Sequence, residues 1–544
     1  MLQRLQPTLT SSQLLLVITL YFTLVFNYPF LRGFMGAILA LEQFNMMFLL
    51  SVPVVTGSIL LIVFSFLALP KLLKPILIII TLTSALVFYA SLNYGTVFDY
   101  GMIQNSVETD QGEALSYVNF QALITFLLVG VLPTLFIAAT KLTPLSIGRA
   151  IVSRLRLIAA AFAVLLTLVF FFYQDYAAVG RNNSHLKKII NPTQYIYSGV
   201  KYVKHNYFDS EIPFKTLDSS PTLNTPKEKE VMVIMLGETA RAQNFASNGY
   251  SKATNQYTAP YTMTSFEHMY SCGTATAVSV PCMFSSMTRD NFERRQADKQ
   301  QNVIDIAQLA GFDVQWISNN GCKNVCDRVP TINIDLDQPN PLCDGHYCQD
   351  EILLTPLAKK LANLQREKTL MVLHMMGSHG PTYYKRYPNS HQKFTPDCQR
   401  SDIQNCSQEQ LVNTYDNTIA YTDFVISKVV AQLDSLAPQY KTSMLYVSDH
   451  GESLGESGVY LHGLPYSFSP VEQRHIPMLL WSSNQRHSNA CISRRARQQE
   501  FSHDNLFHSL LGWLSISSSA YQSELDIFAN CEPSPNIANN SLTD

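Results

Sequence analysis

The stretch MLYVSDHGE, residues 444–452, joins a short apolar run to a cluster of polar residues. Two further stretches have the same form: VMVIMLGET at residues 231–239 and LMVLHMMGSHG at residues 370–380. A continuous apolar run of this length is typical of a strand that is buried on both faces of a parallel sheet. The three stretches therefore predict strands of one sheet, each followed by polar side chains.

The rest of the second half of the chain fits the same architecture. Longer stretches that can hold helices, such as Asn302–Ala310 and Gln410–Leu436, alternate with the apolar runs. Alternation of buried strands and helices predicts an α/β sandwich with a mostly parallel sheet. The runs of strand length are Val231–Leu236, Val314–Ile317, Leu370–Met376, Met444–Val447 and Pro477–Trp481.

Residues that can bind metal follow three of these strands. In open α/β sheets, ligands bind beyond the carboxyl ends of the strands, so residues distant in sequence can converge there. One strand-end carboxylate is more often a helix cap, and one His is usually a surface or core residue. Recurrence at three strand ends favours a metal site, and these oxygen and nitrogen ligands suit zinc or manganese. The candidates are Glu238, His379, Asp449 and His450, with His462 close behind.

A hydrolase or transferase of this type needs a nucleophile, and the stretch Ser271–Ala277 offers the best candidate hydroxyl groups. It is small and flexible, and it leads into a possible helix at Ala277–Met287, which Pro281 limits. A hydroxyl near a helix N-terminus faces free amide groups that favour a phosphate, and metal coordination activates a threonine hydroxyl. Thr274 and Thr276 can equally be plain helix caps, and the residues taken alone favour that simpler interpretation.

Charge divides the 544-residue chain into two unlike parts. The net charge of −2 gives no indication of nucleic-acid binding. Residues 1–174 hold only 13 of the 80 Asp, Glu, Lys and Arg, as expected of a membrane domain before a soluble one. Five stretches there approach the roughly 20 residues that a membrane-spanning helix needs. They are Leu14–Leu31, Met46–Ala68, Ile76–Leu92, Phe120–Thr140 and Leu157–Phe172.

Basic residues predict the orientation of the spans. Lys and Arg lie before the first span, in the loop between the second and third spans, and in the loop between the fourth and fifth spans. By contrast, the loop Tyr94–Val118 has no Lys or Arg and carries four carboxylates. Arg32 is the single exception. The positive-inside rule places the N-terminus in the cytoplasm and everything after Gln174 outside. The residues used are Arg4, Lys71, Lys74, Lys141, Arg149, Arg154 and Arg156, against Asp99, Glu108, Asp110 and Glu113.

All ten cysteines lie in the part predicted to be outside. Most fall in near neighbours, which predicts five disulfides in an oxidising compartment. A metal–thiolate site is the alternative, but the spacing does not resemble a zinc ribbon. The expected pairs are Cys272–Cys282, Cys322–Cys326, Cys343–Cys348, Cys398–Cys406 and Cys491–Cys531. We expect three parts: a membrane domain (1–174), a connector whose start is amphipathic (175–230) and a catalytic domain (231–544).

The motifs together resemble the phosphoethanolamine transferases of Gram-negative inner membranes, which include the lipid A transferases and the mobile colistin-resistance enzymes of the alkaline-phosphatase superfamily. Five ordered motifs carry the resemblance, which covers essentially the whole chain. They are Gly237-Glu238-Thr239-Ala240-Arg241, Ser271-Cys272-Gly273-Thr274-Ala275-Thr276, Gly377-Ser378-His379-Gly380-Pro381, Ser448-Asp449-His450-Gly451-Glu452-Ser453 and Tyr460-Leu461-His462-Gly463.

The resemblance implies a role for each matching residue. Glu238, Thr276, Asp449 and His450 would bind the catalytic zinc, and Thr276 would carry the phosphoethanolamine group. His379 and His462 would contact the phosphoryl group or a second zinc. Other substrate-binding positions would be Lys323, Asn319 (with Asn320 as the alternative, because this loop is one residue short of the family pattern), Asn105 and Glu113.

The implied reaction is a two-step transfer of phosphoethanolamine from phosphatidylethanolamine to lipid A, through a phosphothreonine. The added ammonium group would weaken the attraction of cationic peptides such as polymyxins. We expect a monomer in the bacterial inner membrane, with its catalytic domain in the periplasm and membrane lipids around its spans. Alternatives are a sulfatase or phosphatase, transfer of phosphoethanolamine or phosphoglycerol to another glycan, and a non-catalytic lipid-binding regulator. No C/S-x-P-x-R sulfatase signature surrounds Thr276.

Overall fold

The computed structural model describes residues 7–40, 44–67, 69, 71–109, 111–225, 227–336, 338–483 and 489–531. It divides into two compact units. The first consists of Met1–Ile103 and Val118–Phe208, and the second of Gln104–Tyr117 and Asp209–Asp544. Arg4 and Asp110, used above to predict the orientation, lie outside the described residues, as does Ala68 at the end of a predicted span. The division at residues 174 and 230 stays a prediction.

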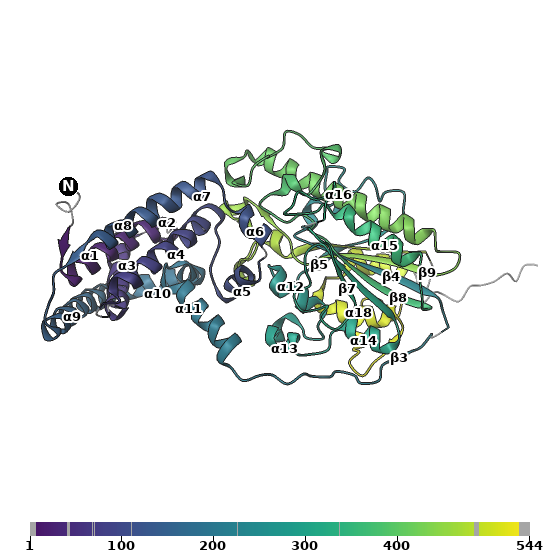
Figure 1. The fold of residues 1–544 in the computed structure, drawn as a ribbon, viewed down its shortest axis with the longest axis horizontal. Helices are drawn as coiled ribbons and strands as arrows, with labels where there is room; N and C mark the ends of the chain where they lie inside the picture. The colour runs from purple at the N-terminus through teal and green to yellow at the C-terminus, as the bar shows by residue number, and fades with distance from the viewer. Residues whose placement is uncertain are drawn as a thin grey trace, which may run out of the picture. The chain divides into compact units, whose positions relative to one another are not determined.

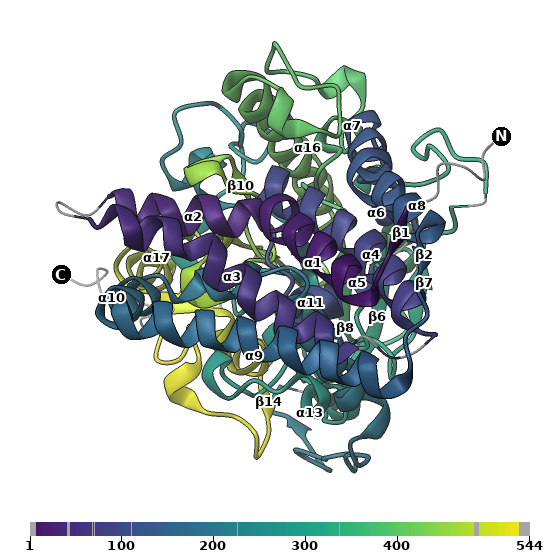
Figure 2. The same cartoon turned by 90° about the vertical axis from the view of Figure 1, so that its left-hand side faces the viewer.

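Helices build the first unit. Among the described residues, four are long and apolar enough to cross a membrane: Met46–Leu67, Leu73–Tyr94, Phe120–Ala139 and Gly148–Phe171. Figure 2 shows α3 and α9 running side by side. The helices are α1 (Ser11–Tyr21), η2 (Phe22–Phe26), α2 (Tyr28–Leu39), α3 (Met46–Leu67), α4 (Leu73–Tyr94), α7 (Phe120–Thr125), η3 (Phe126–Val131), α8 (Leu132–Ala139), α9 (Ile147–Phe171), α10 (Tyr173–Asn182), η4 (Ser184–Ile189), α11 (Thr193–Val203) and η5 (Lys204–Phe208).

The first predicted span is broken. Ser11–Phe26 and Tyr28–Leu39 meet at an angle of 61°, and the chain has five spans if this bent pair counts as one. Asn27 stands at the break, and its buried amide donates to the carbonyls of Phe22 (3.0 Å) and Asn191 (2.6 Å). Pro29 lies in the first turn of α2, where its missing N–H costs nothing. The apolar run Leu14–Leu31 therefore covers parts of two helices.

An eight-stranded mixed sheet forms the centre of the second unit. Its order is β13-β5-β12-β9-β4-β8-β6-β7, and the strands from β9 to β7 run parallel. The antiparallel β12 joins β9 to β5. The bounds are β4 (Glu230–Gly237), β5 (Thr264–Tyr270), β6 (Asp313–Ser318), β7 (Thr331–Asn333), β8 (Lys368–His374), β9 (Lys441–Ser448), β12 (His475–Ser482) and β13 (Phe501–Ser502). The predicted α/β fold with a mostly parallel sheet is confirmed.

Helices cover both faces of this sheet, with α15 and α16 on one and α12, α14 and α18 on the other (Figure 1). Every residue of β4 and of β8 is buried, which explains their unbroken apolar sequences. A capping box between Ser407 and Gln410 starts α16. The helices are α5 (Tyr100–Glu108), α6 (Gln111–Ser116), α12 (Thr276–Met283), α13 (Arg294–Asp298), α14 (Val303–Ala310), α15 (Leu354–Leu361), α16 (Gln408–Asp434), α17 (Asn489–Gln498) and α18 (Leu506–Trp513).

Short pairs of strands complete the description: β1 (Thr8–Leu9) with β2 (Lys141–Leu142), β3 (Thr222–Leu223) with β14 (Ile516–Ser517), and β10 (Ser453–Leu454) with β11 (Tyr460–Leu461). The second unit also contains five disulfides, and they join the five expected cysteine pairs.

Candidate active site

Strand register brings the two motif carboxylates together. The neighbouring strands β4 and β9 pair in register up to Gly237 and Ser448, so Glu238 and Asp449 leave the sheet at the same level. The Thr239 N–H donates to Asp449 Oδ1 (3.0 Å), and the Asp449 N–H donates to the Gly237 carbonyl (3.0 Å). Both carboxylates are fully buried.

Thr276 completes this cluster from a third element. It is the first residue of α12, and its Oγ1 lies 3.1 and 3.3 Å from the two carboxylate oxygens of Glu238. The same hydroxyl lies 3.3 Å from His450 Nε2. Its position at a helix N-terminus favours negative charge at the hydroxyl and on a phosphoryl group that it would carry. The disulfide Cys272–Cys282 ties the preceding loop to the same helix.

The hydrogen bonds of His450 decide which ring nitrogen faces Thr276. His450 Nδ1 lies 2.9 Å from the Gly451 carbonyl, so Nδ1 carries the proton and donates it there. Burial, the largest influence, lowers the pKa of His450 below its usual value. The neutral ring therefore directs the lone pair of Nε2 toward Thr276, Glu238 and Asp449.

Backbone strain accompanies the site. Thr239 has φ of +59° and Leu461, the neighbour of His462, has φ of +64°. Branched side chains rarely adopt such angles, which cost about 1–3 kcal/mol each and persist where surrounding contacts hold them. The Thr239 hydroxyl donates to Glu238 Oε1 (2.6 Å), so the strained residue orients the carboxylate.

The cluster fits a cation. One ligand atom each from Glu238, Asp449 and His450 lies within 4.8 Å of the others, and all three residues are buried. Burial and the adjacent Glu238 raise the pKa of Asp449 well above its usual value. Asp449 Oδ2 is buried and has no hydrogen-bond partner among the described residues. Two buried carboxylates and an uncompensated oxygen are costly without a cation, so the residues suit a bound metal ion.

Two further imidazoles flank the cluster. The His462 ring centre lies 4.4 Å from that of His450 and 5.5 Å from that of His379. Burial, followed by the neighbouring imidazoles, lowers the pKa of His462 well below its usual value. His379 Nε2 lies 3.4 Å from Glu113 Oε1. Burial lowers the pKa of His379, but Glu113 and Glu238 outweigh burial, and the pKa is raised.

The other predicted positions differ in what they touch. Asn320 donates to Glu238 Oε2 (2.8 Å), whereas the Asn319 amide donates to the Cys348 carbonyl and to Asp350, away from the cluster. Of the two asparagines, the structure thus brings Asn320 to the site. Lys323 Nζ donates to the Glu108 carbonyl (3.1 Å), and Asn105 is buried in α5. Asn105, Glu108 and Glu113 all belong to the segment Gln104–Tyr117 of the second unit.

Sequence reasoning missed His503, which joins two loops of the site. The Cys272 N–H donates to its Nδ1 (3.1 Å), and its Nε2 donates to the Ser448 carbonyl (3.0 Å). His503 is fully buried and bridges the loop of Thr276 to the end of β9. Its partners are backbone groups, so no pattern of side chains in the sequence could have indicated this contact.

A mostly parallel α/β sheet whose strand ends gather carboxylates, imidazoles and a threonine in the first turn of a helix defines a sulfatase-like enzyme. Residues 230–516 match the sulfatase family, and residues 57–207 match the family described as phosphoethanolamine transferase EptA/EptB. The chain belongs to the phosphoethanolamine transferase family, as the motifs predicted.

Relatives and a solved structure agree along nearly the whole length. Phosphoethanolamine transferase EptA of Escherichia coli K12 is 38% identical over 98% of this chain and 99% of its own. Phosphatidylethanolamine transferase Mcr-1 of Escherichia coli is 35% identical over 87% of this chain and 90% of its own. The structure of the integral membrane lipooligosaccharide phosphoethanolamine transferase A of Neisseria meningitidis matches with a TM-score of 0.92 at 37% identity. The match covers 97% of this chain and 100% of that chain. The chain is a multi-pass inner-membrane protein with a periplasmic catalytic domain.

Proposed function

We propose that this chain transfers phosphoethanolamine from phosphatidylethanolamine to lipid A, with Thr276 as the covalent carrier. The observation that supports this most directly is the position of the Thr276 hydroxyl, within 3.3 Å of Glu238 and of His450 at the meeting point of two strand ends. The names of relatives that align over nearly the whole chain identify the group transferred.

Glu238, Thr276, Asp449 and His450 would hold one zinc ion, and their oxygen and nitrogen donors suit that metal. His379 and His462 would contact the phosphoryl group or bind a second zinc ion. When bound, the metal supplies positive charge that lowers the pKa of the Thr276 hydroxyl and favours charge on the phosphoryl oxygens. Asn320 and Thr239 both donate to Glu238 and so hold this ligand in place.

The first step forms a bond from Thr276 Oγ to the donor phosphorus and breaks the bond from phosphorus to the glycerol oxygen. The threonine proton is lost, and diacylglycerol leaves after taking up a proton. In the second step a phosphate oxygen of lipid A forms a bond to the same phosphorus, the bond from Thr276 Oγ to phosphorus breaks, and the threonine oxygen takes up a proton to recover its hydroxyl. The amide groups at the N-terminus of α12 and the side chains of His379 and Lys323 would stabilise charge on the phosphoryl oxygens.

The donor headgroup carries an ammonium group, and Asn105 and Glu113 would recognise it. Glu113 supplies a carboxylate close to His379, so one residue would face both the ammonium group and the phosphoryl site. Transfer would reduce the negative charge of lipid A and so weaken the binding of cationic polymyxins. The partners in this proposal are membrane lipids, and nucleic acid is not among them. The protein would act as a monomer.

Lipid A from cells that express this chain tests the proposal. Mass spectrometry should show added phosphoethanolamine with the natural chain, and Thr276→Ala should reduce it by roughly 10³-fold or more while the protein stays folded. Thr276→Ser restores a hydroxyl and should recover part of the activity. Full modification of lipid A by the folded Thr276→Ala protein would show that the threonine carries no intermediate. Unmodified lipid A with the natural chain would exclude this acceptor.

A further inference from the structure

Arg294 is a buried cation that the proposed reaction does not use. Its side chain is 7% exposed, and it lies at the start of α13, outside the strand-end cluster. The guanidinium group contacts four partners from four parts of the second unit. Such a fork of donors can hold several acceptors in a fixed geometry, which a lysine cannot do.

Two of these partners are backbone carbonyls beside site residues. One guanidinium nitrogen donates to the Ala277 carbonyl, directly after Thr276 in the first turn of α12. Another donates to the Lys323 carbonyl (3.2 Å). Lys323 and Asn324 both have positive φ, +48° and +71°, so this turn needs external contacts to persist.

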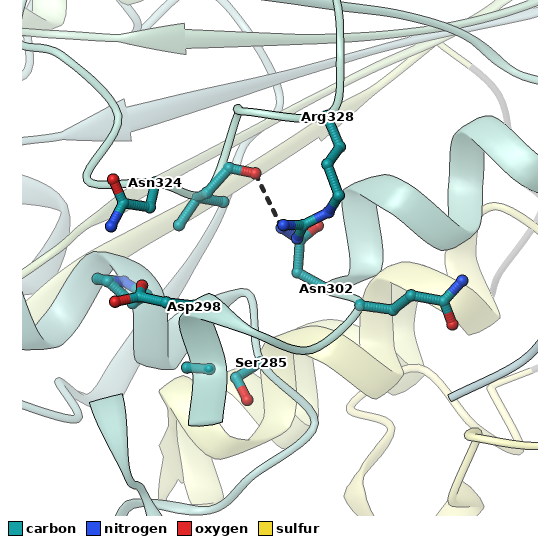
Figure 3. A pocket seen from close by; sticks show the side chains of 9 residues that line it. Ser285, Asp298, Asn302, Asn324 and Arg328 are labelled. Atoms are coloured by element: carbon teal, nitrogen blue, oxygen red, sulfur yellow. Dashed lines mark hydrogen bonds between the residues drawn. The ribbon is translucent and has the colours of Figure 1, made fainter. Parts of the chain in front are cut away.

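The other two partners are carboxylates. Arg294 Nε donates to both oxygens of Asp298, at 2.9 and 3.1 Å, and a terminal nitrogen lies 3.5 Å from Glu108 Oε2. Asp298 and Asn324 line one small pocket, together with Ser285 and Arg328 (Figure 3). Asp298 thus orients the guanidinium group of Arg294, which donates to the turn that carries Lys323.

Glu108 connects this network to the segment Gln104–Tyr117, which also carries Asn105 and Glu113. The backbone carbonyl of Glu108 accepts from Lys323 Nζ (3.1 Å), and its Oε1 accepts from Gln104 (2.8 Å). Further along the segment, the Gly112 carbonyl accepts from the Tyr347 hydroxyl (2.5 Å). Arg294 therefore links the segment to α12, because its guanidinium group contacts both Glu108 and the Ala277 carbonyl.

We infer that Arg294 is a positioning residue that fixes the nucleophile helix α12, the Lys323 turn and the segment Gln104–Tyr117 relative to one another. It touches none of the reacting groups. Loss of its fork would leave two backbone carbonyls and two carboxylates without this donor. A shift of about 1 Å in Thr276 or in the donor-binding residues would then cost on the order of 10²-fold in rate.

Hydrogen exchange in the full-length protein tests the geometric part without any assay of activity. In Arg294→Gln, amides of residues 104–116, 276–283 and 321–325 should exchange faster than in the natural chain. Arg295→Gln is the matched control, because the neighbouring Arg295 instead contacts the Ser210 carbonyl and Asp209. Unchanged exchange in 104–116, or the same increase in the control, would overturn the inference.

Kinetics test the functional part, which rests on the function proposed above. Arg294→Lys keeps the charge beside Glu108 but loses the fork of donors, so kcat per folded molecule should fall on the order of 10²-fold. Losses in Arg294→Gln and Glu108→Gln should be non-additive, whereas Arg295→Gln and Glu108→Gln should add. A fall that merely follows the folded fraction would make Arg294 structural only. If the natural chain transfers nothing, the proposed function fails, and exchange alone decides the inference.

Discussion

Asp449 is the residue at which the metal proposal can be tested most sharply. Burial and Glu238 raise its pKa, so the metal-free site stores repulsion between two carboxylates. Asp449→Asn should abolish most zinc binding, measured by elemental analysis of the purified protein, and transfer with it. The same change removes one charge, so the chelated variant should melt roughly 2–4 °C above the chelated natural protein.

Asp350 provides the control for this prediction. Its carboxylate is also buried, but it accepts from the Met376 and Gly377 amides that follow β8 and from Asn319. Asp350→Asn should therefore keep its zinc although it loses some stability. A zinc content that is unchanged in Asp449→Asn would remove this residue from the ligand set.

The site could be predicted from sequence wherever a side chain follows a strand end. Glu238, Asp449 and His450 fall together because register fixes their level. Asn319 and Asn320 could not be separated, since adjacent residues of a turn point to different partners and the short loop shifts the alignment. Contacts made to backbone carbonyls, as by His503, leave no mark in the sequence.

At the scale of elements, the disulfides divide by what their loops hold. Cys272–Cys282 joins residues 10 apart around the loop that leads to Thr276, and Cys491–Cys531 joins residues 40 apart. Chain entropy gives the short loop less than about 3 kcal/mol and the long loop about 3–4 kcal/mol. Replacing Cys272 and Cys282 by alanines should reduce kcat more than replacing Cys491 and Cys531 does. Replacing Cys491 and Cys531 should lower the melting temperature more. Equal effects of both pairs on kcat would contradict this assignment.

The elements themselves were predicted best where the apolar pattern is continuous. β4, β8 and β9 lie where the apolar runs predict them, although β8 ends at His374 and not at Met376. The first span was predicted as one stretch because hydropathy does not register a bend. Asn27 there satisfies its amide on backbone carbonyls, so a polar residue interrupts the helix without exposing a polar group.

For the whole molecule, buried histidines predict a loss of stability in acid. Burial lowers the pKa of His503 to about 3 and of His508 to about 4. The unfolded chain, with a histidine pKa of about 6.5, binds these protons first as the pH falls. Stability present above pH 6.5 is therefore lost between about pH 6.5 and 3 for His503 and between about pH 6.5 and 4 for His508, by roughly 3–5 kcal/mol for each residue.

Thermal melts of the full chain across this pH range check the prediction. His508→Asn keeps an acceptor for the Gln522 N–H, which donates to His508 Nδ1 (3.1 Å), and removes the titrating group. The melting temperature of this variant should fall less steeply with acid than that of the natural chain. Parallel curves would show that His508 does not titrate on unfolding.

The segment Gln104–Tyr117 lies in the chain between helices of the first unit and belongs to the second. Recombination between relatives therefore has no single crossover point that exchanges one unit intact. A junction near residue 208 would combine the segment Gln104–Tyr117 of one parent with Arg294, Lys323 and His379 of the other. Functional hybrids should need two exchanges made together, so these two stretches are inherited as one module although about 90 residues separate them.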